Sequence, residues 1–216
     1  MKKLISILLV SSLLLSCATS YHPISDLESV GDAETQNEDL NLIVGIQPLG
    51  ENNRFNDTAE ENNITILKLS LENISRDTFS VSNKNIYLRG ITENEPISQL
   101  SPHEVADRMA LVTGAYWLWG LLWFGYYHNE NGDESSLWIP IGLPIALYNF
   151  LKAESTNSDF EDEITNNAFP SGKIAPGEIK NGYLFFNRRG GVKYNLVISY
   201  TDYMGNEKEI MIPYKF

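Results

Sequence analysis

The sequence is poor in the residues from which disulfides, metal sites and common catalytic centres are built. Cys17 is the single cysteine, so no disulfide can form within one chain. The three histidines, His22, His103 and His128, are not spaced as metal ligands are. No nucleophile elbow, phosphate-binding glycine loop or HExxH zinc motif occurs. We therefore expect a protein that is not an enzyme and that needs no metal or cofactor.

Positive charge is also scarce. The chain has 16 Lys and Arg against 28 Asp and Glu, which gives a formal net charge of −12 at pH 7. Nucleic acid is not expected as a partner, because phosphate binding requires clustered Lys and Arg. The same negative charge opposes broad adhesion to an anionic lipid surface.

Two long stretches lack charged residues altogether. Residues 109–127 form a run of 19 without charge, and residues 137–151 form a run of 15. Stretches this apolar need a membrane or a protein partner to cover them. All four tryptophans lie in these stretches, and we expect them to contact membrane lipid or an envelope protein partner: Trp117, Trp119, Trp123 and Trp138.

The N-terminus has the pattern of a secretion signal. Lys2 and Lys3 supply the positive start, and residues 4–15 form an apolar segment too short to be interpreted first as a spanning helix. Residues 14–17, Leu-Leu-Ser-Cys, resemble the lipobox of bacterial lipoproteins. The resemblance implies that residues 1–16 are removed and that Cys17 is lipidated. The alternative is a plain secretion signal with an incidental cysteine.

The lipobox resemblance also implies a location in the cell envelope. Each buried CH₂ of an acyl chain contributes about 0.8 kcal/mol, so the chains on Cys17 would hold the protein at a membrane. Enteric-type sorting retains lipoproteins with Asp after the cysteine in the inner membrane, whereas this chain has Ala18. The outer membrane is therefore expected, and the sequence does not predict on which face of that membrane the protein lies. Removal of Lys2 and Lys3 would leave 200 residues with a net charge of −14.

Alternating apolar and polar residues predict a β-rich domain. Expected turns lie at residues 73–77 and 202–206, and a polar loop at residues 51–63. About seven short strands favour an immunoglobulin-like antiparallel sandwich, split between residues 40–100 and 169–216. Residues 17–39, acidic and without Lys or Arg, are expected to form a solvated tether. The expected strands are residues 40–46, 66–71, 78–82, 85–89, 182–187, 192–201 and 208–214.

The C-terminal strands also carry a family resemblance. Residues 174–178 (Ile-Ala-Pro-Gly-Glu), 182–186 (Gly-Tyr-Leu-Phe-Phe) and 200–202 (Tyr-Thr-Asp) resemble the late strands of bacterial immunoglobulin-like and late-embryogenesis-abundant-type domains. The resemblance covers some 40 residues and implies a β-sandwich, and it implies nothing about activity.

A helical insertion is predicted between the two halves of the sandwich, at residues 101–168. Ser101 and Glu104 form a capping box with Pro102 at the first helical position, and Ser158 and Glu161 form a second. We expect a hydrophobic helical hairpin with arms at residues 109–127 and 137–151. The connecting loop does not match a calcium-binding EF-hand, because Tyr127 and Trp138 would occupy its first and last ligand positions.

Three arrangements of this hairpin remain open. It could insert in or across the bilayer, since 19 helical residues span about 28 Å. It could lie in the membrane interface or dock on a partner membrane protein. It could also fold back over the sandwich as a second core layer. Glycines and prolines in both arms, and Glu130, Asp133 and Glu134 at the tip, oppose simple spanning.

These observations predict a membrane-anchored cell-envelope lipoprotein that acts as a non-catalytic binding or assembly module at the membrane surface. Its partners would be membrane lipid and an envelope protein, and its oligomeric state is left open. The alternative is a small-ligand carrier or a hydrolase with a site between sandwich and hairpin.

Overall fold

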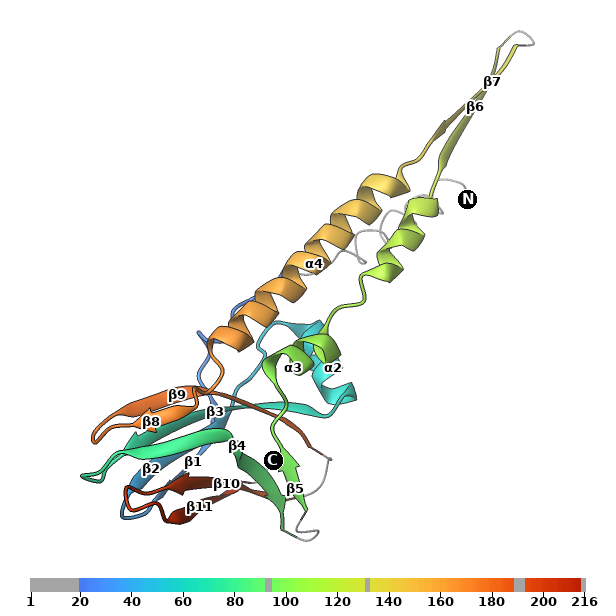
Figure 1. Cartoon of the computed structure of the whole chain (residues 1–216). Coiled ribbons are helices and arrows are strands. Elements are labelled where there is room, and N and C mark those ends of the chain that lie inside the picture. The colour runs from blue at the N-terminus through green and yellow to red at the C-terminus, as the bar shows by residue number, and fades with distance from the viewer. Residues whose placement is uncertain (1–19, 92–94, 131–132, 189–192, 215–216) are drawn as a thin grey trace. The chain divides into compact units, whose positions relative to one another are not determined.

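The computed structural model describes residues 20–91, 95–130, 133–188 and 193–214 and contains two compact units (Figure 1). Among the described residues the fold is mixed α/β, with antiparallel strands more abundant than helix and with three α-helices. Unit 1 comprises Met1–Tyr21 and Leu111–Asp159, and unit 2 comprises His22–Ala110 and Phe160–Phe216.

Unit 2 contains two antiparallel sheets. The first has the order β1-β2-β3-β9, formed by Val30–Gln36, Leu40–Ile46, Ile64–Asn73 and Ile179–Asn187. The second has the order β11-β10-β4-β5, formed by Glu207–Tyr214, Tyr194–Thr201, Phe79–Gly90 and Pro96–Ser98, and β8 (Gly172–Ile174) also pairs with β4.

One hydrophobic core is shared by the two sheets. Alternate residues of β2 and β3 point into it, as Leu42 and Leu69 do, because successive side chains of a strand face opposite sides. Ile86 on β4 and Ile198 on β10 enter the same cluster from the second sheet. Each fully buried aliphatic side chain stabilises the fold by about 1.5–3 kcal/mol. The strand periodicity therefore determines which faces meet.

Most of the expected strands are confirmed, several with extended ends. Residue 192, the first of the expected strand 192–201, lies outside the described residues, and β10 begins at Tyr194. Residues 78–82 and 85–89, predicted as two strands, are a single strand β4. The pairing of β4 with β10 is irregular between Ile198 and Tyr200. This irregularity explains why the alternation of apolar and polar residues is interrupted within β4. The immunoglobulin-like arrangement itself is not confirmed; two antiparallel sheets around a shared core are what the chain shows.

Residues 17–39 are not only a solvated tether, which corrects the prediction for its described part. β1 pairs with β2 along Val30–Gln36, and Ile24 is completely buried. Gln47 Nε2 donates a hydrogen bond to the Ile24 carbonyl at 2.6 Å. The acidic composition concealed this, because an edge strand requires backbone pairing on one side only and can present its charges to water.

The predicted polar loop at residues 51–63 is also wrong in its main part. Residues Asn53–Glu61 form helix α2, which buries Phe55 and Ala59 one turn apart. The Phe55 ring stacks on Phe160 with centroids 4.5 Å apart. Two apolar residues with helical spacing are enough to pack this short helix, because Phe160, which also belongs to unit 2, is the aromatic partner of Phe55.

The helix start predicted at Ser101 is confirmed, and the one predicted at Ser158 is not. Helix α3 runs from Pro102 to Met109, and Ser101 Oγ accepts a hydrogen bond from the Glu104 amide at 3.1 Å. It ends at Met109 rather than continuing into the apolar run. Helix α4 extends from Gly142 to Asn166, so Ser158 lies inside it and starts no helix.

The predicted helical hairpin is replaced by a mixed structure. After α3 the chain forms the 3-10 helix η1 (Gly114–Leu121), then strands β6 (Phe124–Glu130) and β7 (Asp133–Ile139), and then α4. β6 and β7 pair from Phe124↔Ile139 to Glu130↔Asp133. The missed signal was Asn131-Gly132, because Asn-Gly between two apolar runs is a strong β-hairpin signal.

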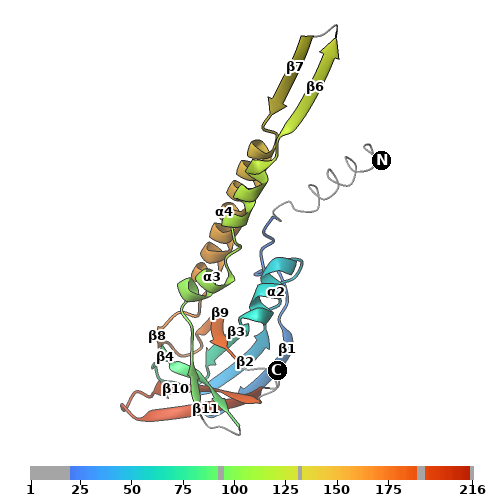
Figure 2. The same cartoon turned by 90° about the vertical axis from the view of Figure 1, so that its right-hand side faces the viewer.

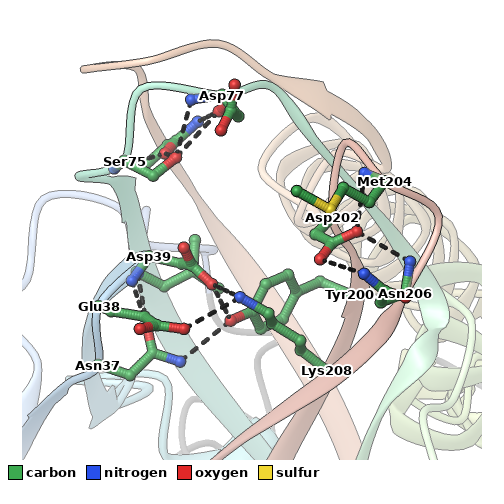
Figure 3. Close-up of polar contacts among 12 residues, drawn as sticks. Asn37, Glu38, Asp39, Ser75, Asp77, Tyr200, Asp202, Met204, Asn206 and Lys208 are labelled. Atoms are coloured by element: carbon green, nitrogen blue, oxygen red, sulfur yellow. Dashed lines mark hydrogen bonds and ion pairs between the residues drawn. The ribbon is translucent and has the colours of Figure 1, made fainter.

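A polar network joins the two sheets of unit 2 (Figure 3). The Tyr200 hydroxyl of β10 donates to Asp39 Oδ2 at 3.0 Å and accepts from Asn37 Nδ2 at 3.1 Å. Lys208 Nζ of β11 donates to the same Asp39 oxygen at 2.6 Å and to Glu38 Oε1 at 3.1 Å. Because residues 37–39 connect β1 to β2, these bonds hold the first sheet against the second.

Two tyrosines of unit 2 titrate above their ordinary range. Burial raises the pKa of Tyr200 to about 12, and its hydrogen bond to Asp39 acts in the same direction. Burial also raises the pKa of Tyr183 to about 12, with further contributions from Glu163 and Asp26. In both cases the folded protein favours the neutral phenol.

These shifts predict alkaline unfolding. A pKa higher in the folded than in the unfolded state gives stability that is complete below pH 10 and lost as pH rises to about 12. We expect the free energy of unfolding, measured by denaturant titration with far-ultraviolet circular dichroism, to fall through that window. Tyr200→Phe should make this decline in the free energy of unfolding smaller. It should also lower the free energy of unfolding by about 0.5–1.5 kcal/mol at neutral pH, because the hydroxyl's hydrogen bonds are lost. A flat profile between pH 10 and 12 would contradict this.

Candidate functional site

Unit 1 is the candidate site, and a glycine at the start of α4 determines how its segments meet. A Cβ at Gly142 would lie 1.8 Å from the Trp119 carbonyl oxygen, so only glycine fits at the start of α4. The Gly142 amide donates to the Leu122 carbonyl at 3.0 Å. At Gly120 a Cβ would already touch Leu143 and Ala146 at 3.4 and 3.9 Å. The backbones of η1 and α4 therefore approach closely.

Further contacts hold the two arms of unit 1 together. The Asn157 side chain accepts from the Leu111 amide at 2.8 Å and donates to the Leu111 carbonyl at 3.2 Å. The rings of Trp117 and Phe150 lie 5.5 Å apart between centroids. β6 and β7 continue beyond the end of the η1–α4 pair in both views (Figure 1 and Figure 2).

The side chains that α4 buries within unit 1 are small or polar. They are Ala146, Asn149, Ala153 and Thr156, which recur at three- and four-residue intervals. Leu111 and Tyr116 are the larger buried side chains of the unit. A helix in water would normally bury its leucines, and α4 does the opposite.

The exposed side of unit 1 carries its large apolar residues. On α4, Leu143, Leu147 and Leu151 share one face and are 47%, 48% and 57% exposed. We call the full set the apolar surface of unit 1: Val112, Trp117, Leu118, Leu121, Trp123, Phe124, Tyr126, Leu137, Trp138, Ile139, Ile141, Leu143, Leu147, Tyr148 and Leu151. No charged residue occurs at positions 109–129 or 135–151.

Three of the four predicted contact residues belong to this surface. Trp117, Trp123 and Trp138 are about half exposed or more, whereas Trp119 is partly buried and contributes its carbonyl to the Gly142 contact. Trp138 lies across Gly125 on the paired strand, where a Cβ would be 2.7 Å from its ring. Their contact with lipid or a partner stays a prediction.

The remaining predicted features lie outside this surface or outside the described residues. Cys17 and the signal sequence fall in the undescribed N-terminal segment. In the described part of the chain no helix is both long and apolar enough to cross a membrane. The searched residues contain no group of three His, Cys, Asp or Glu side chains arranged to hold a metal ion.

His103 is an exposed histidine in an acidic surrounding. Its Nδ1 lies 2.9 Å from Glu161 Oε1, and its Nε2 lies 3.6 Å from Asp107 Oδ2. The hydrogen bond to Glu161 and the charge of Asp107 raise its pKa above the ordinary value. The backbone of His22 exchanges hydrogen bonds with the Asn52 side chain at 2.9 and 2.7 Å.

The Gly142 contact can be tested directly. Gly142→Ala places a methyl group against the Trp119 carbonyl, and we expect a loss of about 1–3 kcal/mol from the stability of unit 1. Gly114→Ala is the matched control, because a Cβ there has no atom within 4 Å. Since all four tryptophans lie in unit 1, denaturant titration by tryptophan fluorescence reports on this unit. Equal stability of the two variants would contradict the contact.

Comparison with known proteins gives distant structural similarity only. No family model matches the chain, and no curated protein matches its sequence. A functionally unknown protein from Listeria monocytogenes is 11% identical, with TM-score 0.36, over 94% of this chain and 91% of that one. The GAE domain of GGA2p from Saccharomyces cerevisiae is 8% identical, with TM-score 0.33, over 86% and 97%.

The comparison also includes a candidate lipoprotein, ycdA of Bacillus subtilis. It is 12% identical with TM-score 0.37, and the match covers 85% of this chain and 39% of that one. The chain thus spans about two-fifths of the length of the Bacillus protein. The present chain is therefore distantly similar to a candidate bacterial lipoprotein of unknown function.

Proposed function

We propose that this protein is a cell-envelope lipoprotein, anchored through Cys17, whose unit 1 binds membrane lipid. It acts as a non-catalytic module at the membrane, with the outer membrane as the expected location because Ala18 follows Cys17. The observation that carries the proposal is the reversed packing of unit 1. Small and polar side chains are buried there, and large apolar ones are exposed.

Reversed packing favours lipid over water as the surroundings. In membranes, helices associate through small residues and buried Asn or Thr, while leucines face the acyl chains. Gly120, Ala146 and Asn149 fit the first description, and Leu143 and Leu147 fit the second. Exposed Trp and Tyr suit the headgroup region, where one end of the ring is apolar and the other is wet.

The dimensions of unit 1 fit a bilayer. The apolar part of α4, residues 142–151, rises about 15 Å at about 1.5 Å per residue. The apolar part of the ribbon, residues 124–127 with 136–139, adds about 13 Å at about 3.3 Å per residue. Together these make about 28 Å, against a hydrocarbon thickness of about 30 Å. Charged residues begin at Lys152 at one end and at Glu130 and Glu134 at the other.

The anchoring and lipid contact can be separated with Cys17→Ser, which is exported but cannot be lipidated. We expect wild type to incorporate labelled palmitate, and Cys17→Ser to remain in membranes after a carbonate wash. Brominated lipid should then quench the tryptophans, because at least three are exposed.

Each result decides between named explanations. Absence of label on wild type would refute lipidation, and full release of Cys17→Ser by carbonate would refute lipid binding by unit 1. Retention without quenching would indicate an envelope protein partner instead. Separation of the two membranes by density tests the expected outer-membrane location.

A single charge in the apolar surface should weaken membrane retention. Leu121 ends η1 near the junction between the helical part and the ribbon, close to the middle of the apolar length. In the Cys17→Ser background, Leu121→Arg should make the free energy of partitioning into the membrane less favourable by about 2.5–3.5 kcal/mol. This corresponds to roughly 70–400-fold weaker partitioning into vesicles.

The matched control is Met204→Arg, in the exposed turn between β10 and β11 of unit 2. This variant should partition like its parent. Equal loss of vesicle flotation in both variants would contradict lipid binding through the apolar surface of unit 1.

A further inference from the structure

The ribbon β6–β7 has two open edges. Its sheet contains these two strands, so each has a neighbour on one side and none on the other in the described part of the chain. Such an edge presents backbone N–H and C=O groups that readily pair with another strand. The edges carry no Lys, Arg or Pro along residues 124–129 and 135–139, and the charged residues of the two strands are confined to Glu130, Asp133 and Glu134 next to the turn.

The base of the ribbon is apolar on both faces. Leu137, Trp138 and Ile139 are consecutive in β7 and are 59%, 64% and 44% exposed. Because successive side chains of a strand point to opposite faces, neither face is covered. Phe124 and Tyr126 on β6 are more than half exposed as well. One flat docking surface could cover only one of the two faces.

A single copy of the ribbon cannot cover both apolar faces and also satisfy the backbone groups on its open edges. Lying flat on a membrane, the ribbon would leave one apolar face in water. Standing upright among acyl chains, it would cover both faces, but each unpaired backbone group on its edges would cost several kcal/mol in hydrocarbon. Pairing of the edges between copies removes this cost and keeps both faces in lipid.

We infer that the ribbons of several copies pair edge to edge in the membrane, β6 of one copy beside β7 of the next. The inference rests on the proposed lipid binding by unit 1. Copies anchored through Cys17 share one orientation relative to the membrane, so rotation about its normal relates them. Under that rotation β6 and β7 of neighbours run antiparallel, and repeated head-to-tail pairing closes into a ring.

Charge along the chain is compatible with this pairing. The apolar residues 124–127 and 136–139 bring no like charges together. Glu130, Asp133 and Glu134 lie outside these two stretches in the sequence. Repulsion between their like charges on neighbouring copies is screened by salt. Pairing is therefore expected to strengthen as ionic strength rises.

Disulfide formation between copies tests the pairing. Single cysteines are placed in β6 by Phe124→Cys or Tyr126→Cys and in β7 by Leu137→Cys or Ile139→Cys, with Cys17 retained for lipidation. The lipidated proteins are reconstituted in phosphatidylcholine vesicles and oxidised. A disulfide needs Cβ atoms about 3.5–4.5 Å apart, so adjacent strands of two copies can react. Strands two positions away, at about 10 Å, cannot.

We expect several-fold more disulfide dimer in at least one mixture of a β6 variant with a β7 variant than in either alone. Wild type controls for a free thiol at Cys17, and Met204→Cys for random collision of unit 2. Dimers in β6 variants alone, as abundant as in the mixtures, would overturn the head-to-tail arrangement. Vesicle-bound protein with no dimer in any mixture would overturn the inference alone. Protein that does not float with vesicles would overturn both this inference and the proposed function.

Discussion

The close approach of Gly142 to the Trp119 carbonyl is the constraint on which the rest of unit 1 depends. A side chain at position 142 would force η1 and α4 apart. With glycine there, the two backbones come into contact where α4 begins. The side chains that α4 buries along the rest of unit 1, such as Ala146 and Ala153, are small or polar, and most leucines and tryptophans of this region are exposed.

Unit 2 follows the opposite packing rule. Its two sheets bury leucine, isoleucine, phenylalanine and tyrosine side chains in one shared core, as a protein in water does. The bonds of Asp39 to Tyr200 and Lys208 add a directional link between the sheets. One chain thus contains a unit that buries its large apolar side chains and a unit in which most of the large apolar side chains are exposed.

Sequence patterns predicted the parts of the fold that depend on local periodicity. The alternation in β2 and β10, the helix N-cap at Ser101 and the turn at residues 202–206 are all present. Helix α2 and strand β1 were missed, because their polar surfaces hide the few residues that pack. The apolar insertion was predicted as two helices, since apolar runs without polar positions carry no period from which helix and strand can be distinguished.

The sequence by itself determined that residues 109–151 are apolar, free of charge except near positions 130–134, and rich in tryptophan. It also determined the lipobox resemblance at Cys17, which depends on four adjacent residues and no fold. Only the tertiary structure decided that this stretch becomes a 3-10 helix, a β-ribbon and a long helix with its large side chains outward. That outcome depends on contacts between residues 20 or more positions apart, such as Gly142 with Trp119 and Asn157 with Leu111. No local pattern encodes such contacts.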